Sequence, residues 1–495
     1  MMSVSSLPLT SRITTLLGAL LLACVAGMAA PSRADEIEPE PTTEAPVVEQ
    51  APPKEQPAPT PPKQAEEPAS HVHEVNPTPR RSFEEVVKDI WTRDKLSGDW
   101  KGLRTDLHDH GIDIDLRLSQ YGQGVASGGV QKSFEYGARM NYRVHADLAK
   151  ALGTWEGLSI DLHAMTRFGE DILPDTGGLV IPNTELLMPL PGKYSDSDIT
   201  GLTINQYFPL YEGQLGLLTL GKLDVIDAVT LFFPNVSYGQ ESFLNVSALV
   251  SALPWFGAVR GLSLYGGWLA SINEEYQIGQ SGLLVTGTDN VTTSWDISDS
   301  FKHGAWIAAF HRFLWKLDDK PGYFMVFAGG STRDQVSIES LDFVFKPGVG
   351  VTVSAEEKKP WNIAAYISQV FWQAKEDPNR KATLLIGGTG GPDDPQFSNW
   401  NIFAAVEAFG PMASRPHDRM GVSGWYNSLS DDFVDTLSDL PIDPIFLRDT
   451  WGFELYYNFA INQWLHLTPD LQLVKNEFKG DNLAIIPGVR LVMDF

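Results

Sequence analysis

Charged side chains alternate with apolar ones in the first strand-like stretches of the chain, and they are the groups with the clearest chemistry. The charged members of these stretches are Arg117, Glu135, Arg139, Arg143, Asp161, His163 and Arg167. Guanidinium groups donate hydrogen bonds, carboxylates accept them, and a neutral imidazole does both. Gathered on one face, such groups could replace part of the hydration shell of a polar solute without any covalent step.

Motifs for covalent catalysis do not occur in the sequence. It has no Gly-x-Ser-x-Gly, His-Glu-x-x-His or P-loop segment. A glycoside hydrolase needs two carboxylates about 5 to 9 Å apart. The 62 acidic residues supply candidates by chance and single out no pair. The pairs His71/His73 and His108/His110 lack a third ligand, so we expect no metal site and no cofactor.

The composition of the 495 residues narrows the class of protein. A formal charge of −25 argues against nucleic acid as a partner, because phosphates attract Lys and Arg. The single cysteine, Cys24, excludes a disulfide framework. After residue 30 no run of about 18 apolar residues occurs, which argues against a helical multispanning membrane protein. The 44 glycines and the many aromatic residues are typical of a turn-rich β-protein with aromatic girdles.

The first 34 residues have the pattern of a signal peptide. Arg12 supplies the positive start, 13–30 is apolar, and small residues precede the expected cleavage after Ala34. A transmembrane anchor is the alternative, but Pro31 and an acidic stretch follow the apolar run at once. Lipidation of Cys24 is a second alternative, since the residues before it loosely resemble a lipoprotein signal.

Residues 35–79 are expected to form an extended, disordered tether. Twelve of these 45 residues are prolines, and ten acids stand against two lysines. Proline removes amide donors and like charges repel, so no packed structure is expected. In 80–95, apolar residues recur at helical spacing between Phe83 and Ile90, which predicts a short amphipathic helix. Whether the tether docks to the cell wall is an open question, because no particular residue supports such a contact.

Residues 96–495 alternate between apolar and polar side chains. At the C-terminus, for example, Val489, Leu491 and Met493 alternate with Arg490 and Asp494. Successive strand residues point to opposite faces, so each strand has one apolar and one charged face. Strands of about 9–11 residues suit a tilted bilayer crossing, where only a closed barrel satisfies every backbone group. We therefore predict an all-β, transmembrane antiparallel β-barrel of 16 strands, with about 25 residues per strand and connection.

Some segments do not follow the alternation. Three stretches rich in Gly, Pro, Asp and Thr are expected to be loops: 174–198, 282–299 and 387–398. Two others, 323–327 and 402–409, are almost continuously apolar, so the pattern does not determine which of their side chains face inward.

Both ends of 96–495 carry specific motifs. Gly98, Asp99, Trp100 and Arg104 belong to a segment that reads Gly-Asp-Trp-Lys-Gly-Leu-Arg-Thr. Toward the C-terminus stand Glu-Leu-Tyr-Tyr at 454–457 and Leu-Thr-Pro-Asp-Leu-Gln at 467–472, and the chain ends in Phe495. These segments resemble the opening and the closing strands of the carbohydrate-selective porins of the OprB family. The middle of the chain is similar only loosely.

The resemblance implies an outer-membrane porin that passes monosaccharides or small oligosaccharides by facilitated diffusion through a water-filled, charged lumen. It implies small neutral sugars as solutes, outer-membrane lipids and the assembly machinery as partners, and a tether in the periplasm. The terminal Phe495 is similar to the signal that this machinery reads. Whether the protein forms a homo-oligomer is left open by the resemblance. The acidity of the region should disfavour anions.

The resemblance also ranks the candidate residues for a lumen constriction. Arg167 stands where the family has an arginine on an early strand and is the first candidate, ahead of the other charged residues named above. Lys222 stands where the family often has arginine, but lysine lacks the planar fork. Gly98, Asp99, Trp100 and Arg104 are expected to fix the N-terminal segment to the barrel. Three other functions stay open: a general, non-selective porin, a wall-tethered structural barrel, and a secreted glycoside hydrolase on a β-scaffold.

Overall fold

The computed structural model describes the barrel and part of the segment before it. The described residues are 83–153, 155–187, 196–211, 214–227, 240–248, 263–276, 278–289, 291, 295–340, 342–346, 350–354, 356–439 and 444–495. The expected signal peptide (1–34), the tether (35–79) and Cys24 lie outside them. Among the described residues, no helix is both long and apolar enough to cross a membrane.

The chain divides into two compact units, of which one contains Ile90–Phe495 and the other is Ala30–Asp89. The helix α2 (Phe83–Thr92) lies within the interval 80–95 that was expected to be helical. Its residues up to Asp89 are the described part of the second unit. The barrel and its connections belong to the first unit.

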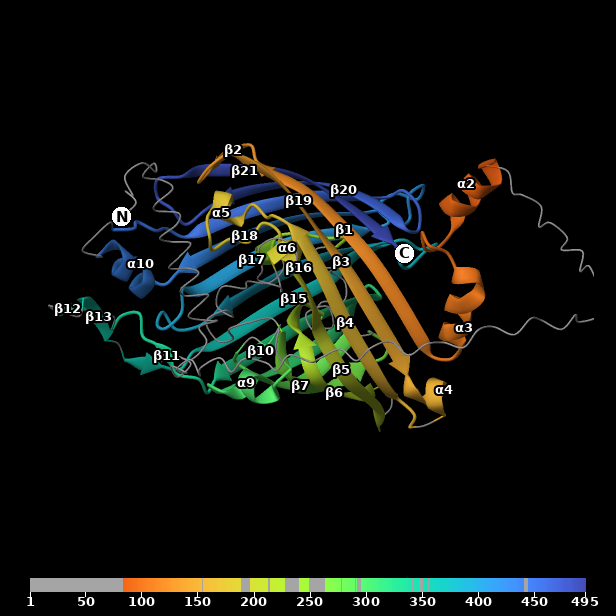
Figure 1. The fold of residues 1–495 in the computed structure, drawn as a ribbon, viewed down its shortest axis with the longest axis horizontal. Coiled ribbons are helices and arrows are strands. Elements are labelled where there is room, and N and C mark those ends of the chain that lie inside the picture. The colour runs from red at the N-terminus through yellow and green to blue at the C-terminus, as the bar shows by residue number, and fades with distance from the viewer. Residues whose placement is uncertain are drawn as a thin grey trace, which may run out of the picture. The chain divides into compact units, whose positions relative to one another are not determined.

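One antiparallel sheet closes into a barrel (Figure 1). Each strand pairs with its neighbours in the chain, and β1 pairs with β21, with Arg117 opposite Asp494, to complete the ring. The barrel strands are β1 (Ile112–Val125), β3 (Ser133–Asp147), β4 (Leu158–Gly169), β5 (Asp196–Tyr211), β6 (Gln214–Asp224), β7 (Ser263–Asn273), β8 (Ile278–Gly287), β9 (Ala305–Leu317), β10 (Lys320–Ser331), β15 (Trp361–Gln373), β16 (Lys381–Gly390), β17 (Ser398–Phe409), β18 (Arg419–Leu429), β19 (Thr450–Ala460), β20 (Leu465–Lys475) and β21 (Asn482–Asp494). The predicted barrel of 16 strands is confirmed.

The connections differ in length at the two ends of the barrel. At the end where β1 begins and β21 finishes they are short, and Asp318 and Asp319 alone join β9 to β10. We call this the turn end and the opposite one the loop end. The turn end carries α4 (Leu148–Leu152), on the right in Figure 1. Loop-end connections carry β2 (Ser127–Gly129), α5 (Leu173–Thr176), α6 (Thr184–Leu187), η2 (Val246–Ala248), α9 (Ile297–Phe301), β11 (Gln335–Val336), β12 (Asp342–Lys346), β13 (Gly350–Ser354), β14 (Glu357–Lys358) and α10 (Asp431–Ser438).

The expected alternation of faces is confirmed in the strands. On β19, Phe453 and Leu455 are each 51% exposed on the outer face, whereas Glu454 between them is 0% exposed. An outward apolar face suits hydrocarbon, and the inward face holds the polar groups. Exposed aromatic side chains stand near both ends, such as Trp361 and Trp400 toward the loop end. This is the arrangement of aromatic girdles in transmembrane barrels.

The two continuously apolar stretches have a physical explanation in the barrel interior. Tyr323, Met325 and Phe327 of β10, like Phe403 of β17, are buried inside. They belong to a hydrophobic cluster that also contains Phe243, from a loop-end connection that folds inward. These strands therefore face lipid on one side and apolar protein on the other, so alternation is lost in the sequence.

Two of the expected loops begin later in the structure than the sequence predicts. β8 continues to Gly287 and β16 to Gly390, so 282–287 and 387–390 are strand and not loop. The glycines are there because aromatic rings lie over them. A Cβ atom on Gly282 would come 2.5 Å from the Phe310 ring, and one on Gly387 would come 2.3 Å from the Tyr366 ring. Glycine in these segments therefore marks close packing across strands and not a turn.

The Gly-Asp-Trp motif forms η1 (Trp100–Gly102) and the start of α3 (Leu103–Asp109) at the turn end. Gly98 and Gly102 have φ of 67° and 95°, a left-handed conformation that favours glycine. Asp99 accepts hydrogen bonds from the backbone nitrogen and the hydroxyl of Thr105, both at 2.9 Å. The guanidinium of Arg104 lies 4.3 Å from the centre of the Trp100 ring. The motif thus folds on itself and presents Arg104 to the final strand.

Candidate functional site: the barrel lumen

Two loop-end connections fold into the lumen and line its inner wall. The first inward segment, 170–187, joins β4 to β5, and the second inward segment, 240–248, belongs to the connection from β6 to β7. In the first, the Pro182 carbonyl accepts a hydrogen bond from Gln472 at 2.8 Å. The Thr176 carbonyl accepts one from Asn476, also at 2.8 Å. The first inward segment is therefore held on the side of the wall formed by β20 and its loop-end connection.

Buried carboxylates hold the second inward segment. The two oxygens of Glu454 accept hydrogen bonds from the backbone nitrogens of Leu244, at 2.5 Å, and Asn245, at 3.0 Å. Ser242 donates to Glu407 at 2.6 Å. The Phe243 ring packs edge-on against Tyr456 with ring centres 4.9 Å apart. These three hydrogen bonds and the ring contact together fix the segment across the lumen.

A charged group forms on the wall made by β3, β4 and the start of the connection after β6. We call it the Arg143 group: Arg143, His163 and Asp227. One Asp227 oxygen lies 2.5 Å from Arg143 Nη2, and the other lies 2.7 Å from His163 Nδ1. Burial would raise the pKa of Asp227, but His163 and Arg143 hold that pKa well below its ordinary value. The Arg143 side chain is still 44% exposed, so donors and an acceptor stand side by side at the water-filled surface.

Arg139 connects this wall to the first inward segment. Its Nη1 lies 3.1 Å from the Glu185 carboxylate, with both side chains only 1% exposed. Its Nε donates to Asn141 Oδ1 at 2.8 Å, and His163 Nε2 lies 3.0 Å from the same oxygen. Three of the residues predicted from sequence, Arg139, Arg143 and His163, are thus linked through a few shared partners.

Arg117 forms a separate charged group with the second inward segment. It pairs with Asp494 at 2.5 Å and with Glu241 at 3.1 Å. Arg419 approaches Glu241 from β18, at 3.6 Å. Burial alone would raise the pKa of Glu241, but Arg117, Arg419 and their basic neighbours hold that pKa below its ordinary value. Glu241 therefore stays charged between two arginines.

The other predicted residues lie apart from these groups. Arg167 is 5% exposed and pairs with Asp171 of the first inward segment at 3.0 Å. Lys222 lies over the Trp295 ring at 4.7 Å. Asp161 lies near His145, at 2.6 Å, and Asn205, at 2.5 Å. Glu135 lies on β3 nearer the loop end. The structure does not gather all eight candidates into one constriction.

Sequence reasoning missed three residues at the second inward segment. Glu407 and Arg419 of the wall, and Glu241 of the segment itself, were not singled out. The signal for Glu407 was a lone charge inside the apolar stretch 402–409, where lipid would not accept it. Nothing in 240–248 indicated that it would cross to β17–β20, because these contacts join residues about two hundred positions apart.

Within the described part of the chain, two clusters contain the types of atom that bind metal ions. In each of the sets His163/Asp224/Asp227 and Glu339/Asp394/Asp432, one ligand atom per residue lies within 4.8 Å of the others. In each set, at least one carboxylate pairs with a basic side chain of the protein. Arg143 contacts Asp227 at 2.5 Å, and Lys358 contacts Asp394 at 2.6 Å and Glu339 at 3.1 Å.

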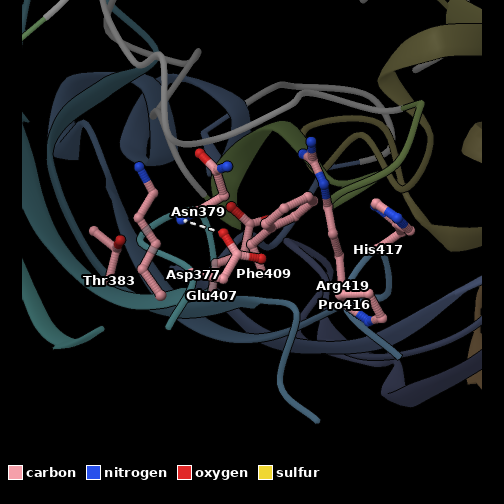
Figure 2. Close-up of a pocket in the computed structure, with 9 residues that line it drawn as sticks. Asp377, Asn379, Thr383, Glu407, Phe409, Pro416, His417 and Arg419 are labelled. Carbon is pink, nitrogen blue, oxygen red and sulfur yellow. Dashed lines mark hydrogen bonds between the residues drawn. The ribbon is translucent and has the colours of Figure 1, made fainter. Parts of the chain in front are cut away.

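A cavity of about 390 Å³ opens near the turn end, below the second inward segment (Figure 2). Strands β16, β17 and β18 form it, together with the turn that joins β15 to β16 and the turn that joins β17 to β18. Its lining residues are Asp377, Asn379, Lys381, Thr383, Glu407, Phe409, Pro416, His417 and Arg419. We call it the turn-end cavity. It combines donors, acceptors and one aromatic ring in a volume within the usual range for small-molecule sites, about 300–1,000 Å³.

Comparison with known proteins adds to this geometry. A family model described as "Carbohydrate-selective porin, OprB family" matches residues 131–495. Porin B of Pseudomonas aeruginosa is 22% identical over 430 residues, which cover 80% of this chain and 90% of that protein. A high-pH structure of Pseudomonas putida OprB superposes with a TM-score of 0.66 and 19% identity, covering 82% of this chain and 99% of that one. At that identity, the structural match establishes the fold alone.

Proposed function

The chain belongs to the OprB family of carbohydrate-selective porins, and on that premise we propose that small neutral sugars cross its lumen by facilitated diffusion past the Arg143 group. The protein is an outer-membrane carbohydrate porin. Its family and fold are those of a channel and not of an enzyme. We infer that the Arg143 group contacts the solute and favours neutral sugars.

The pairing of Arg143 with Asp227 is the observation that carries the proposal. A partly exposed guanidinium and a carboxylate, 2.5 Å apart, offer donors and an acceptor at one place. Neighbouring hydroxyls of a sugar can accept from the first and donate to the second. Since the two charges compensate each other, the site suits an uncharged solute. Contacts of this kind stay weak enough for the solute to leave.

The other lumen residues have supporting roles in this proposal. Arg139 and Arg167 hold the first inward segment through Glu185 and Asp171. Arg117 holds the second through Glu241. These arginines set the width of the path, while Arg143 touches the solute. Arg167, the first candidate from sequence, acts in this proposal by positioning.

We also propose an orientation for the barrel. Barrels of the outer membrane have short turns in the periplasm and longer loops outside the cell. The turn end, with α3 and Phe495, therefore faces the periplasm, and we propose the periplasm for the expected tether as well. Sugars enter at the loop end, pass the inward segments and leave at the turn end. Contact of the tether with the cell wall, and Phe495 as assembly signal, belong to the same proposal.

The test is sugar-induced noise in the ion current through single channels in planar bilayers. With methyl α-D-glucopyranoside as the probe, wild-type protein should show concentration-dependent noise. Arg143→Met should weaken the apparent binding constant by roughly tenfold, about 1.4 kcal/mol. Lys359→Met is the matched control, because Lys359 lies in a loop-end connection and is 59% exposed. An unchanged constant in Arg143→Met would remove this group from the solute path, and noise-free wild-type channels would leave a general pore.

A further inference from the structure

We propose that the turn-end cavity is a second carbohydrate subsite, which binds one neutral pyranose unit as it leaves the lumen. The inference rests on the proposed function, since it assumes that sugars travel toward the turn end. The cavity lies next to the second inward segment, because Ser242 of that segment donates to Glu407 of its lining at 2.6 Å. A solute that passes the segment on this side enters the cavity next.

The charged groups of the cavity are held in place before any ligand arrives. Arg419 is fixed from two sides, since its guanidinium lies 4.9 Å from the centre of the Phe409 ring and 3.6 Å from Glu241. Glu407 accepts hydrogen bonds from Ser242 and from the Tyr456 hydroxyl. Groups fixed in this way lose little side-chain entropy when a ligand binds, which favours recognition.

The turn between β15 and β16, at the cavity mouth, is held by its own hydrogen bonds. Asn379 donates its backbone N–H to the Asp377 carboxylate at 3.0 Å, drawn as a dashed line in Figure 2. The backbone nitrogen of Arg380 donates to the Asp377 carbonyl at 3.0 Å. Asp377 and Asn379 therefore stand at the rim on a stable turn, and they add an acceptor and an amide to the lining.

The balance of charge in the cavity indicates an uncharged ligand. Lys381 and Arg419 are basic and Asp377 and Glu407 are acidic, so the formal charges of the lining balance. A sugar acid would be attracted by one pair and repelled by the other. A neutral sugar can use all four, with the Thr383 hydroxyl and the Asn379 amide as further partners. The ring of Phe409 adds an apolar surface, as the C–H face of a pyranose requires.

The size of the cavity limits the ligand to about one sugar unit. Its 390 Å³ lies near the lower end of the range for small-molecule sites, about 300–1,000 Å³. Longer oligosaccharides would bind through one unit at a time, with the rest in the lumen or outside the mouth. The cavity thus extends the proposed function. It gives the solute a second binding site, nearer the turn end than the inward segments.

The test uses full-length protein in planar bilayers, with methyl α-D-glucopyranoside added on the turn-end side only. Thr383→Val keeps the shape of the side chain but loses the hydroxyl, and Lys381→Met removes one cation. We expect each variant to weaken the binding constant measured from this side by roughly threefold or more. Lys320→Met is the matched control, because Lys320 lies at the turn end on β10, outside the cavity. It should bind as the wild type does.

Three outcomes decide between the proposals. If both variants bind the probe as the wild type does while sugar still crosses the channel, the cavity is not a subsite and the proposed function stands. If glucuronate binds from the turn-end side more tightly than the neutral glucoside, the inferred class of ligand is wrong. If sugar does not cross wild-type channels at all, the proposed function itself has failed. A variant that does not fold is recognised by its lost conductance, and Thr383→Val, the milder change, then decides.

Discussion

Arg104 donates a hydrogen bond, 2.7 Å long, to the main-chain oxygen of Phe495, the last residue of the chain. The same guanidinium donates to the Gly98 carbonyl at 3.2 Å. Nearby, the backbone nitrogen of Leu96 donates to the Asp494 carbonyl at 2.7 Å. The motif at the start of the barrel therefore holds the strand at its end, next to the pairing of β1 with β21 that closes the ring.

Arg104→Ala should destabilise the folded barrel by about 1–3 kcal/mol, because a charged hydrogen bond and the contact with Trp100 are lost together. Urea unfolding of the protein in detergent measures this. Arg104→Lys should recover only part of the loss, since lysine cannot serve both carbonyls with a planar fork. Lys359→Ala, at an exposed loop-end position, serves as the control. Equal unfolding midpoints for Arg104→Ala and this control would contradict the role given to Arg104.

The barrel could be predicted from sequence because its outward face must be apolar in every strand. Alternation on β19 and β21 therefore identified both faces correctly. The glycines of β8 and β16 led to the wrong prediction of loops from 282 and 387. Glycine is as compatible with a close aromatic contact as with a turn. Where an inward segment packs on the wall, as at Phe403, both faces are apolar and the pattern carries no information about direction.

The lumen groups could be predicted only in part. Arg139, Arg143 and His163 lie on neighbouring strands and were among the candidates. Their partners Glu185 and Asp227, however, come from connections whose path no local pattern reveals. Which arginine stays exposed to water also depends on those connections. Arg167 ranked first because of its place in the family resemblance, although the Arg143 side chain has the larger exposed fraction, 44% against 5%.

Glu454→Gln should loosen the second inward segment. Gln offers one acceptor where the carboxylate gives two, and its amide would meet the N–H of Leu244 or Asn245. We expect a larger single-channel conductance and a noisier open state, because the segment then moves within the lumen. Planar-bilayer recording measures both. Glu376→Gln, at an exposed site in a turn, should behave as the wild type. A conductance unchanged by Glu454→Gln would show that the segment is held without the Glu454 hydrogen bonds.

Arg167→Ala should alter sugar flux or single-channel conductance without unfolding the barrel. Arg167 contacts Asp171 at 3.0 Å, and Asp171 accepts the backbone N–H of Leu173 at 2.9 Å, so the substitution frees the start of the first inward segment. A positioning role predicts that conductances for small ions and for sugars change together, whereas direct contact with solute would alter the sugar binding constant alone. Unchanged flux and conductance would remove Arg167 from the constriction.

Glu477, in the connection after β20, should make stability depend on pH. Burial raises its pKa to about 7, from an ordinary 4.5. The folded protein thus binds this proton more tightly than the unfolded chain does, so stability is highest below about pH 4.5 and falls as the pH rises to about 7. The loss amounts to roughly 3 kcal/mol at most. Glu477→Gln, which resembles the protonated acid, should remove this part of the difference between about pH 5 and pH 8. Identical urea midpoints for variant and wild type at both pH values would contradict the assignment.

Swelling of liposomes that contain the purified protein tests the central claim most directly. The solutes are glucose, glucuronate and an amino acid of similar size, compared at equal osmolarity. Selective passage of neutral sugars past the paired charges of Arg143 and Asp227 predicts that glucose enters fastest and glucuronate slowest. Equal rates for all three solutes would contradict the account and leave a general, non-selective pore.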